Sequence, residues 1–297
     1  MRQSSLQAIP DSEIVKFVAF NENGSKMNKR VTNILRLLQT LALLLFASHT
    51  WAQPVSPQLV RELAPEGTLR AAINFGNPVL AQRDATTGEP RGISVDLSRE
   101  LARRLGVPVE LVPFEAAGKV ADAAKAGKWD IAFLAIDPGR ANDVAFTAPY
   151  VVIEGTYLVP ADSPLRTIDD VDRAGVRIAV GKGSAYDLYL TRTIKNAQLV
   201  RAPTSPTVID VFRDQKLEVA AGVRQQLIAF AFGQPDLRVM DGRFMVIEQA
   251  IGTPKGRQKA LEFLKRFVED VRASGFVAHA LARSNQRDAL VAVPVEH

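Results

Sequence analysis

Two polar positions of this sequence could bind an anion. Arg140 ends the turn-like phrase Asp137-Pro138-Gly139-Arg140, and a guanidinium presents a fork of N–H donors that matches both oxygens of a carboxylate. Ser184 follows Gly183 at a predicted helix start, where free N–H groups and the helix dipole favour negative charge. Residue type alone also permits plainer roles, a surface arginine that caps a turn and a serine that caps a helix.

Other kinds of chemistry have little material in this chain. The 297 residues contain no cysteine, which excludes disulfides, cysteine nucleophiles, thiolate zinc sites and iron–sulfur clusters. The chain beyond residue 52 has only two histidines, His279 and His297, so catalysis by a histidine has few candidate residues. No His/Asp/Glu spacing indicates a metal site, and Gly181-x-Gly183 lacks the third glycine of a dinucleotide fingerprint. We therefore expect no metal and no cofactor.

The N-terminal segment has the three parts of a secretory signal peptide. A basic stretch begins at Met27, an apolar run spans 37–46, and small residues lead to Ala52. The apolar run is shorter than the ~20 residues that span a bilayer, so we expect cleavage before Gln53 and a periplasmic protein. An uncleaved anchor is the alternative. Residues 1–26 resemble no part of a signal peptide; we interpret them as a non-native or mis-assigned extension and 27–52 as the signal peptide.

The net charge of +5 depends strongly on that segment. Residues 1–52 hold six of the 37 basic and three of the 32 acidic side chains, so the remaining chain carries about +2. It contains no dense Lys/Arg block with interleaved aromatic residues, and we expect no nucleic-acid partner. At roughly 150 residues per domain, 245 remaining residues suffice for two linked lobes.

Alternating strand-like and helix-like patterns must position the polar residues. Predicted strands are 69–74, 109–114, 129–136, 176–180, 198–201, 217–221 and 237–240. Predicted helices are 93–105, 120–126, 167–174, one from Ser184, one opened by Ser205-Pro206, 224–232, and a long amphipathic helix through Leu261 and Val271. The β-α-β-α-β order of the first block predicts a parallel sheet covered on both faces. The fold class is α/β, with two lobes and a cleft between them.

Four phrases resemble, in order, motifs of the family-3 bacterial extracellular solute-binding proteins of polar amino-acid ABC transporters. They are 88–97 (GEPRGISVDL), 126–132 (AGKWDIA), 137–141 with 146–150 (DPGRA, FTAPY) and 180–184 (VGKGS). The resemblance covers nearly all of residues 66–285. It implies a type II periplasmic-binding fold, in which two α/β lobes joined by two hinge crossovers clamp a ligand.

The resemblance also implies boundaries and partners. Crossovers fall near 155–161 and 244–253, lobe 1 comprises 57–157 with 250–297, and lobe 2 comprises 158–249. The implied function is capture of a small carboxylate-bearing solute, amino-acid-like or an organic acid, and its delivery to an inner-membrane ABC permease. We expect the protein to be a monomer.

The family pattern assigns roles to several positions. Arg140 occupies the position at which the family's arginine grips the ligand α-carboxylate, and Ser184 would add N–H donors or its hydroxyl. Ala135 replaces a residue that bears a hydroxyl in many members, so only its backbone could contact a ligand. Phe75 lies in the loop after the first strand, where the family often places an aromatic wall; core packing is the alternative.

One departure from the pattern concerns the ligand's amino group. Val223 stands where the family's aspartate pairs with the α-ammonium, and Arg224 follows it. An ammonium buried against these two residues would lose its counter-charge at a cost of several kcal/mol, unless Glu154 or Asp96 supplied a carboxylate. If Arg224 faces the cleft, an anionic or dicarboxylic ligand is favoured.

Two other functions remain open. A periplasmic dehydratase resembling cyclohexadienyl dehydratases would need a carboxylic general acid beside the anion-binding arginine, and Glu154 is the candidate. A soluble subunit that presents its ligand to a separate sensor is the third possibility.

Overall fold

Two groups of parallel strands occupy opposite parts of one ten-stranded sheet. The computed structural model describes residues 56–286 and 288–293; the predicted extension and signal peptide lie outside the described residues. In the first group β1 pairs in parallel with β4 and β5, and in the second β7 pairs in parallel with β8 and β9. The parallel sheet predicted for the first block is confirmed, and the second alternating block also contains parallel pairs. The strands are β1 (Leu69–Asn74), β4 (Val109–Phe114), β5 (Ile131–Ala135), β7 (Arg177–Gly181), β8 (Gln198–Ala202) and β9 (Val219–Val223).

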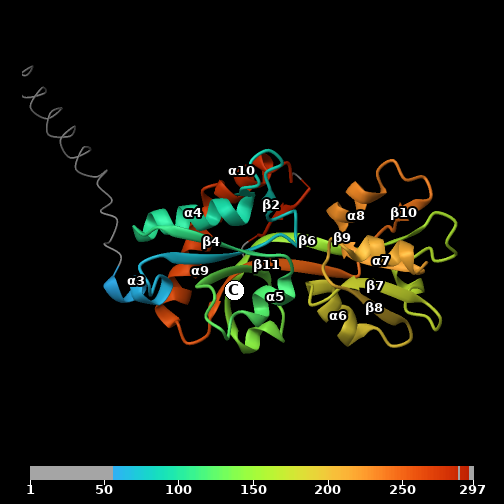
Figure 1. The fold of residues 1–297 in the computed structure, drawn as a ribbon, viewed down its shortest axis with the longest axis horizontal. Coiled ribbons are helices and arrows are strands. Elements are labelled where there is room, and N and C mark those ends of the chain that lie inside the picture. The colour runs from blue at the N-terminus through green and yellow to red at the C-terminus, as the bar shows by residue number, and fades with distance from the viewer. Residues whose placement is uncertain (1–55, 287, 294–297) are drawn as a thin grey trace, which may run out of the picture. The chain divides into compact units, whose positions relative to one another are not determined.

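Two long antiparallel strands join the groups. β6 (Val144–Pro160) pairs with β11 (Met245–Pro254) and with β9, and β11 also pairs with β5. Figure 1 shows both running between the groups. The predicted crossovers fall within or at the ends of β6 and β11, whose pairing makes the sheet mixed rather than parallel. The fold is the expected α/β fold of two lobes with two crossovers; the exact lobe boundaries stay a prediction.

Short strands complete the sheets. β10 (Leu237–Val239) and β12 (Leu290–Val291) pair with β6, and β2 (Gln82–Arg83) pairs with β3 (Pro90–Arg91) in a separate hairpin.

Helices cover the strands of each lobe (Figure 1). The predicted bounds of the helix at 93–105 are confirmed, and so is its apolar stripe, which is buried. None of the helices in the described part of the chain is long and apolar enough to cross a membrane. The helices are α3 (Pro57–Leu63), α4 (Ile93–Leu105), α5 (Ala117–Asp122), α6 (Ala185–Thr193), α7 (Val208–Asp214), α8 (Arg224–Ala231), α9 (Gln258–Ala273) and α10 (Phe276–Arg283), with 3-10 turns η1 (Arg140–Asn142) and η2 (Ile168–Asp170).

Three helix predictions were wrong in extent. The helix predicted at 167–174 is only the turn η2, because Asp170 accepts hydrogen bonds from the backbone at 166 and 167, and such local bonds compete with a helix. The helix predicted from Ser205 begins at Val208 after Thr207, and that predicted at 120–126 is α5, which ends at Asp122.

The buried residues show why both faces of each strand group are covered. Ala71 and Ile73 of β1 pack in one hydrophobic cluster, whereas Ala72 packs in another on the opposite face. Ile178 and Ala179 of β7 divide between two clusters in the same way. This double coverage leaves the ends of the strands as the positions where polar side chains can gather.

Candidate functional site

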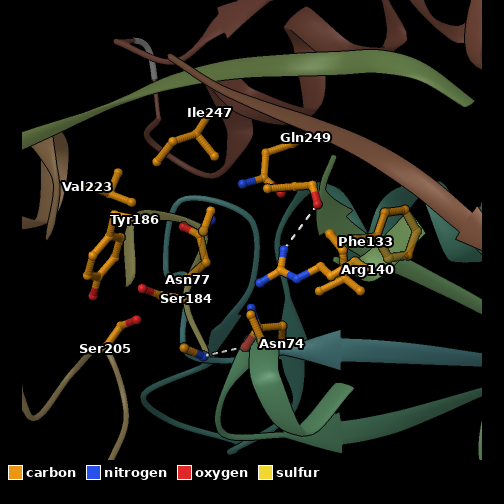
Figure 2. A pocket seen from close by; sticks show the side chains of 15 residues that line it. Asn74, Asn77, Phe133, Arg140, Ser184, Tyr186, Ser205, Val223, Ile247 and Gln249 are labelled. Carbon is orange, nitrogen blue, oxygen red and sulfur yellow. Dashed lines mark hydrogen bonds between the residues drawn. The ribbon is translucent and has the colours of Figure 1, made fainter. Parts of the chain in front are cut away.

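A small cavity lies between the two lobes, where the carboxyl ends of β1, β5, β7 and β9 converge. Its volume is about 30 Å³, room for about two waters. Both lobes and β11 contribute to its walls (Figure 2). The lining residues are Asn74, Gly76, Asn77, Ala117, Phe133, Leu134, Ala135, Arg140, Ser184, Ala185, Tyr186, Ser205, Val223, Ile247 and Gln249.

Arg140 is the charged side chain of this lining. It is 6% exposed. Its Nη1 donates to the carbonyl oxygen of Ala135 at 3.0 Å and its Nη2 donates to that of Gly183 at 2.8 Å, while its buried Nε has no hydrogen-bond partner. Burial lowers the pKa of Arg140 to about 10, so the guanidinium keeps its charge at neutral pH. A buried cation with an unused donor is suited to receive an anion.

Asp137 fixes the backbone that carries this arginine. Its Oδ1 accepts hydrogen bonds from the backbone nitrogens of Gly139 and Arg140, at 2.8 and 3.3 Å. These bonds close the turn between β5 and η1 and hold Arg140 at the carboxyl end of β5. The aspartate therefore acts on the site through the arginine's backbone.

Ser184 lies at the N-terminus of α6, as predicted. Its Oγ accepts a hydrogen bond from the backbone nitrogen of Asp187 at 3.0 Å, so the serine caps the helix and its own O–H is left as a donor. Gly183, directly before it, provides the carbonyl that Arg140 reaches from the other lobe. Both predicted anion-binding positions thus line one cavity.

Ala135 and Phe75 are placed differently. Ala135 lines the cavity, and its carbonyl oxygen accepts from Arg140, consistent with a backbone role. Phe75 is not among the lining residues: its ring packs in the first lobe's core, with the Arg83 guanidinium carbon 4.0 Å from the ring centroid. The neighbours Asn74 and Gly76 do line the cavity, at the turn after β1 in which Asn74 Oδ1 accepts a hydrogen bond from the backbone nitrogen of Gly76.

Glu154 and Arg224 contact each other outside the cavity lining. Arg224 Nε donates to Glu154 Oε2 at 2.8 Å, Arg243 binds the other carboxylate oxygen, and Arg224 also donates to the carbonyl of Gly242. Arg224 therefore does not supply a second cation to the cavity, and Glu154 does not supply a carboxylate. The negative charge of Glu154 on β6 and the positive charge of Arg224 at the start of α8 neutralise each other.

We predict that this cluster gives a pH-dependent contribution to stability. Hydrogen bonds from Arg243 and Arg224 lower the pKa of Glu154. A lowered carboxyl pKa stabilises the fold fully above the ordinary glutamate pKa, and this stabilisation is lost as the pH falls through the lowered pKa. Glu154→Gln should therefore cost about 1 kcal/mol or less near pH 7, because the cluster is partly exposed.

Urea unfolding of both proteins between pH 3 and pH 7 measures this effect. The difference between native chain and variant should shrink towards acid pH. Glu262→Gln, at an exposed position of α9, serves as the control. A difference that stays constant with pH would contradict the role of the Glu154 charge.

Several lining residues were not predicted as site residues. Asn74 and Asn77 flank the turn after β1, a position that a loop signal after a strand could have indicated. Gln249 lies on β11 and is 4% exposed. No local sequence pattern indicates that it lines the cavity, because the pairing of β11 with β5 brings it there. Ser205, expected as a helix cap, lies instead in the loop before α7 and lines the cavity.

An ion pair beside the cavity also links the lobes. Arg192 of α6 donates to Asp137 Oδ2 at 2.8 Å; the two side chains are 46% and 4% exposed. Because the carboxylate is buried, the pair contributes more to lobe contact than an exposed pair would. It lies next to Arg140, whose own bond to Gly183 spans the same boundary.

Arg192→Ala should weaken ligand binding about three- to tenfold by destabilising the closed arrangement. Calorimetric titration and small-angle scattering with ligand measure affinity and closure. Arg177→Ala is the matched control, because Arg177 pairs with Glu218 inside the second lobe. Equal effects of the two substitutions would contradict a closing role for Arg192.

Comparisons with known proteins agree on the fold. The model of the bacterial extracellular solute-binding proteins, family 3, matches residues 69–284. The cyclohexadienyl dehydratase of Pseudomonas aeruginosa is 26% identical over 197 residues, which cover 65% of this chain and 71% of that protein. The L-cystine-binding protein TcyJ of Escherichia coli K12 is 20% identical over 244 residues, covering 80% and 90%. The solute receptor for L-cysteine of Neisseria gonorrhoeae superposes with a TM-score of 0.67 at 22% identity, covering 77% and 93%.

Proposed function

Because the chain belongs to the bacterial extracellular solute-binding proteins of family 3, we propose that it is a periplasmic protein that captures a small carboxylate-bearing solute and delivers it to an inner-membrane ABC permease. The observation that carries the solute class is Arg140, a buried guanidinium with an unpaired Nε in an interlobe cavity. Relatives that are named for binding L-cystine and L-cysteine support a small carboxylate-bearing solute.

The geometry supports capture by lobe closure. The cavity of about 30 Å³ is lined by both lobes, and it has too little room for a solute much larger than two waters unless the lobes move apart. Contacts of Arg140 with Gly183 and of Arg192 with Asp137 then re-form around it. A solute that binds the closed state more tightly than the open state shifts the population towards the closed state. The permease would then recognise the closed state.

A thermal-shift screen of small carboxylates, followed by scattering, tests the proposal. The chain from Gln53 onward should gain about 3 kcal/mol of stability at a ligand concentration of 100 times Kd, and its radius of gyration should fall. If no carboxylate raises the melting temperature at millimolar concentration, the proposed function is wrong.

The second candidate is an enzyme of the cyclohexadienyl dehydratase type, favoured by the 26% identical relative. Among the described residues, the cavity lining includes no carboxylic acid, and two arginines lower the pKa of Glu154, the opposite of what a general acid needs. Incubation with prephenate or arogenate decides between the two functions. Steady product formation that Glu154→Gln abolishes would overturn the binding role.

A further inference from the structure

The cavity of about 30 Å³ beside Arg140 presents a positive charge and hydrogen-bond donors, and its described lining includes no carboxylate. The larger neighbouring cavity that Arg140 also lines, of about 340 Å³, includes Asp122, Asp137 and Asp143. Among the described lining residues of the smaller cavity Arg140 is the charged one, and the other polar side chains are neutral amides and hydroxyls. Burial raises the pKa of Tyr186, so its hydroxyl also stays neutral. A ligand that fits this lining carries one negative charge near Arg140.

Three of the neutral groups already accept hydrogen bonds from the backbone. Asn74 Oδ1 accepts from the backbone nitrogen of Gly76 at 3.0 Å, and Asn77 Oδ1 accepts from that of Val79 at 3.3 Å. Each amide is therefore left with its NH₂ donors. Ser184 likewise accepts from the helix. Such a lining suits an oxygen acceptor on the ligand better than an ammonium, which can only donate.

The carboxylates nearest to the site are engaged elsewhere. Asp187 accepts hydrogen bonds from the backbone nitrogen of Gly183 and from Arg201. Asp137 holds the turn before Arg140 and pairs with Arg192, and Glu154 pairs with two arginines. Each of these charges already has a cationic partner. None of these three is left to balance a ligand ammonium in the cavity of about 30 Å³.

Part of the wall across the cavity from the arginine is apolar and consists of Val223 and Ile247. Figure 2 shows Arg140 and Gln249 on one side and this apolar wall on the other, next to the hydroxyl-bearing Tyr186, Ser184 and Ser205. An α-ammonium directed at this wall would lose its water and gain no counter-charge. A methyl or methylene group directed at this wall would not meet that cost.

Resting on the proposed function, we propose that the solute is a carboxylate without an ammonium group, of the 2-oxo or 2-hydroxy acid class. Its carboxylate binds Arg140, its 2-oxygen accepts from the amide and hydroxyl donors, and its carbon chain packs against Val223 and Ile247. This chain thereby differs in ligand class from the relatives that are named for amino acids.

Matched solute sets test the inference with the chain from Gln53 onward. The sets are propionate, pyruvate, L-lactate and L-alanine; L-2-hydroxyisocaproate and L-leucine; and L-2-hydroxyglutarate and L-glutamate. Calorimetric titration should give at least tenfold tighter binding for a hydroxy or oxo acid than for its amino acid. Equal or tighter binding of the amino acids overturns the inference and leaves the proposed function standing. A chain that binds no member of any set contradicts the proposed function, and the inference with it.

Val223→Asp supplies the missing charge and gives a second test. Val223 is the N-cap residue of α8 and makes no cap hydrogen bond, so an aspartate there can accept from the first N–H groups of the helix. The variant should shift the ratio of amino-acid to hydroxy-acid affinity at least tenfold towards the amino acid. Val223→Asn caps equally well and has nearly the same size without the charge, so it should not shift the ratio. Equal shifts in both variants, or none in Val223→Asp, overturn the inference.

Discussion

Replacing Arg140 by alanine is expected to weaken carboxylate binding at least 100-fold. The guanidinium can give two charge-assisted hydrogen bonds to one carboxylate, and each contributes about 1.5–3 kcal/mol. Their combined loss corresponds to a factor of about 100 or more in Kd. Calorimetric titration with the best-binding carboxylate measures the effect. It is expected to be the largest of any single substitution in the cavity.

The fold should tolerate this substitution. Arg140 is buried with an unpaired Nε and a pKa lowered to about 10 by desolvation, so its burial is costly in the absence of an anion. Removing the charge relieves that cost and offsets the loss of the bonds to Ala135 and Gly183. The melting temperature without ligand should therefore change little, which separates binding from folding.

Arg140→Lys provides the matched comparison. Lysine keeps the positive charge but has a single ammonium in place of the planar fork, so binding should be intermediate between the native chain and Arg140→Ala. If Arg140→Ala binds the carboxylate within threefold of the native chain, the arginine does not hold it, and the proposed function loses its main support.

Replacing Gly183 by alanine is expected to weaken binding about 10- to 100-fold by keeping the lobes apart. Gly183 lies in the loop between β7 and α6 with φ of 70°, and a Cβ there would lie 2.8 Å from the Cα of Gly118 in α5. This contact is between backbones of opposite lobes, so neither side can yield by rotating a side chain. The clash exists only when the lobes meet.

A second glycine separates the clash from local strain. The positive φ alone costs an alanine about 1–2 kcal/mol, and Gly175, with φ of 86° and no atom within 4 Å of its virtual Cβ, carries the same strain without the clash. Gly175→Ala should lower stability and leave affinity unchanged. Scattering with ligand should show a larger radius of gyration for Gly183→Ala alone. Equal affinity of the two variants would contradict the closure mechanism.

Much of the fold could be predicted because it depends on local patterns. The spacing of Ile93, Leu97, Leu101 and Leu105 alone placed α4, and alternation of strands and helices indicated two α/β blocks, the first with a parallel sheet. Ser184 was placed correctly because a cap depends on residues within one turn of it. The errors at 167–174 and at Ser205 arose where side chains of Asp170 and Thr207 bond to nearby groups instead of allowing the helix to extend.

The composition of the site depended on contacts between distant residues. Phe75 and Glu154 have the residue types of an aromatic wall and a cleft acid, yet one packs into the core and the other pairs with Arg224, 70 positions away. Gln249 reaches the cavity because β11 pairs with β5 across more than a hundred residues. No local pattern encodes such pairings.

The sequence by itself determined the α/β class, the parallel pairing of the first block and the helix cap at Ser184, because hydrophobic period and capping act over a few residues. Only the tertiary structure decided which charges meet. It joined the lobes through β6 and β11, enclosed Arg140 between them, and paired Glu154, Asp137 and Asp187 with arginines outside the cavity lining. The physical reason is that a buried charge is stable only with a partner, and the fold as a whole determines which partner lies within reach.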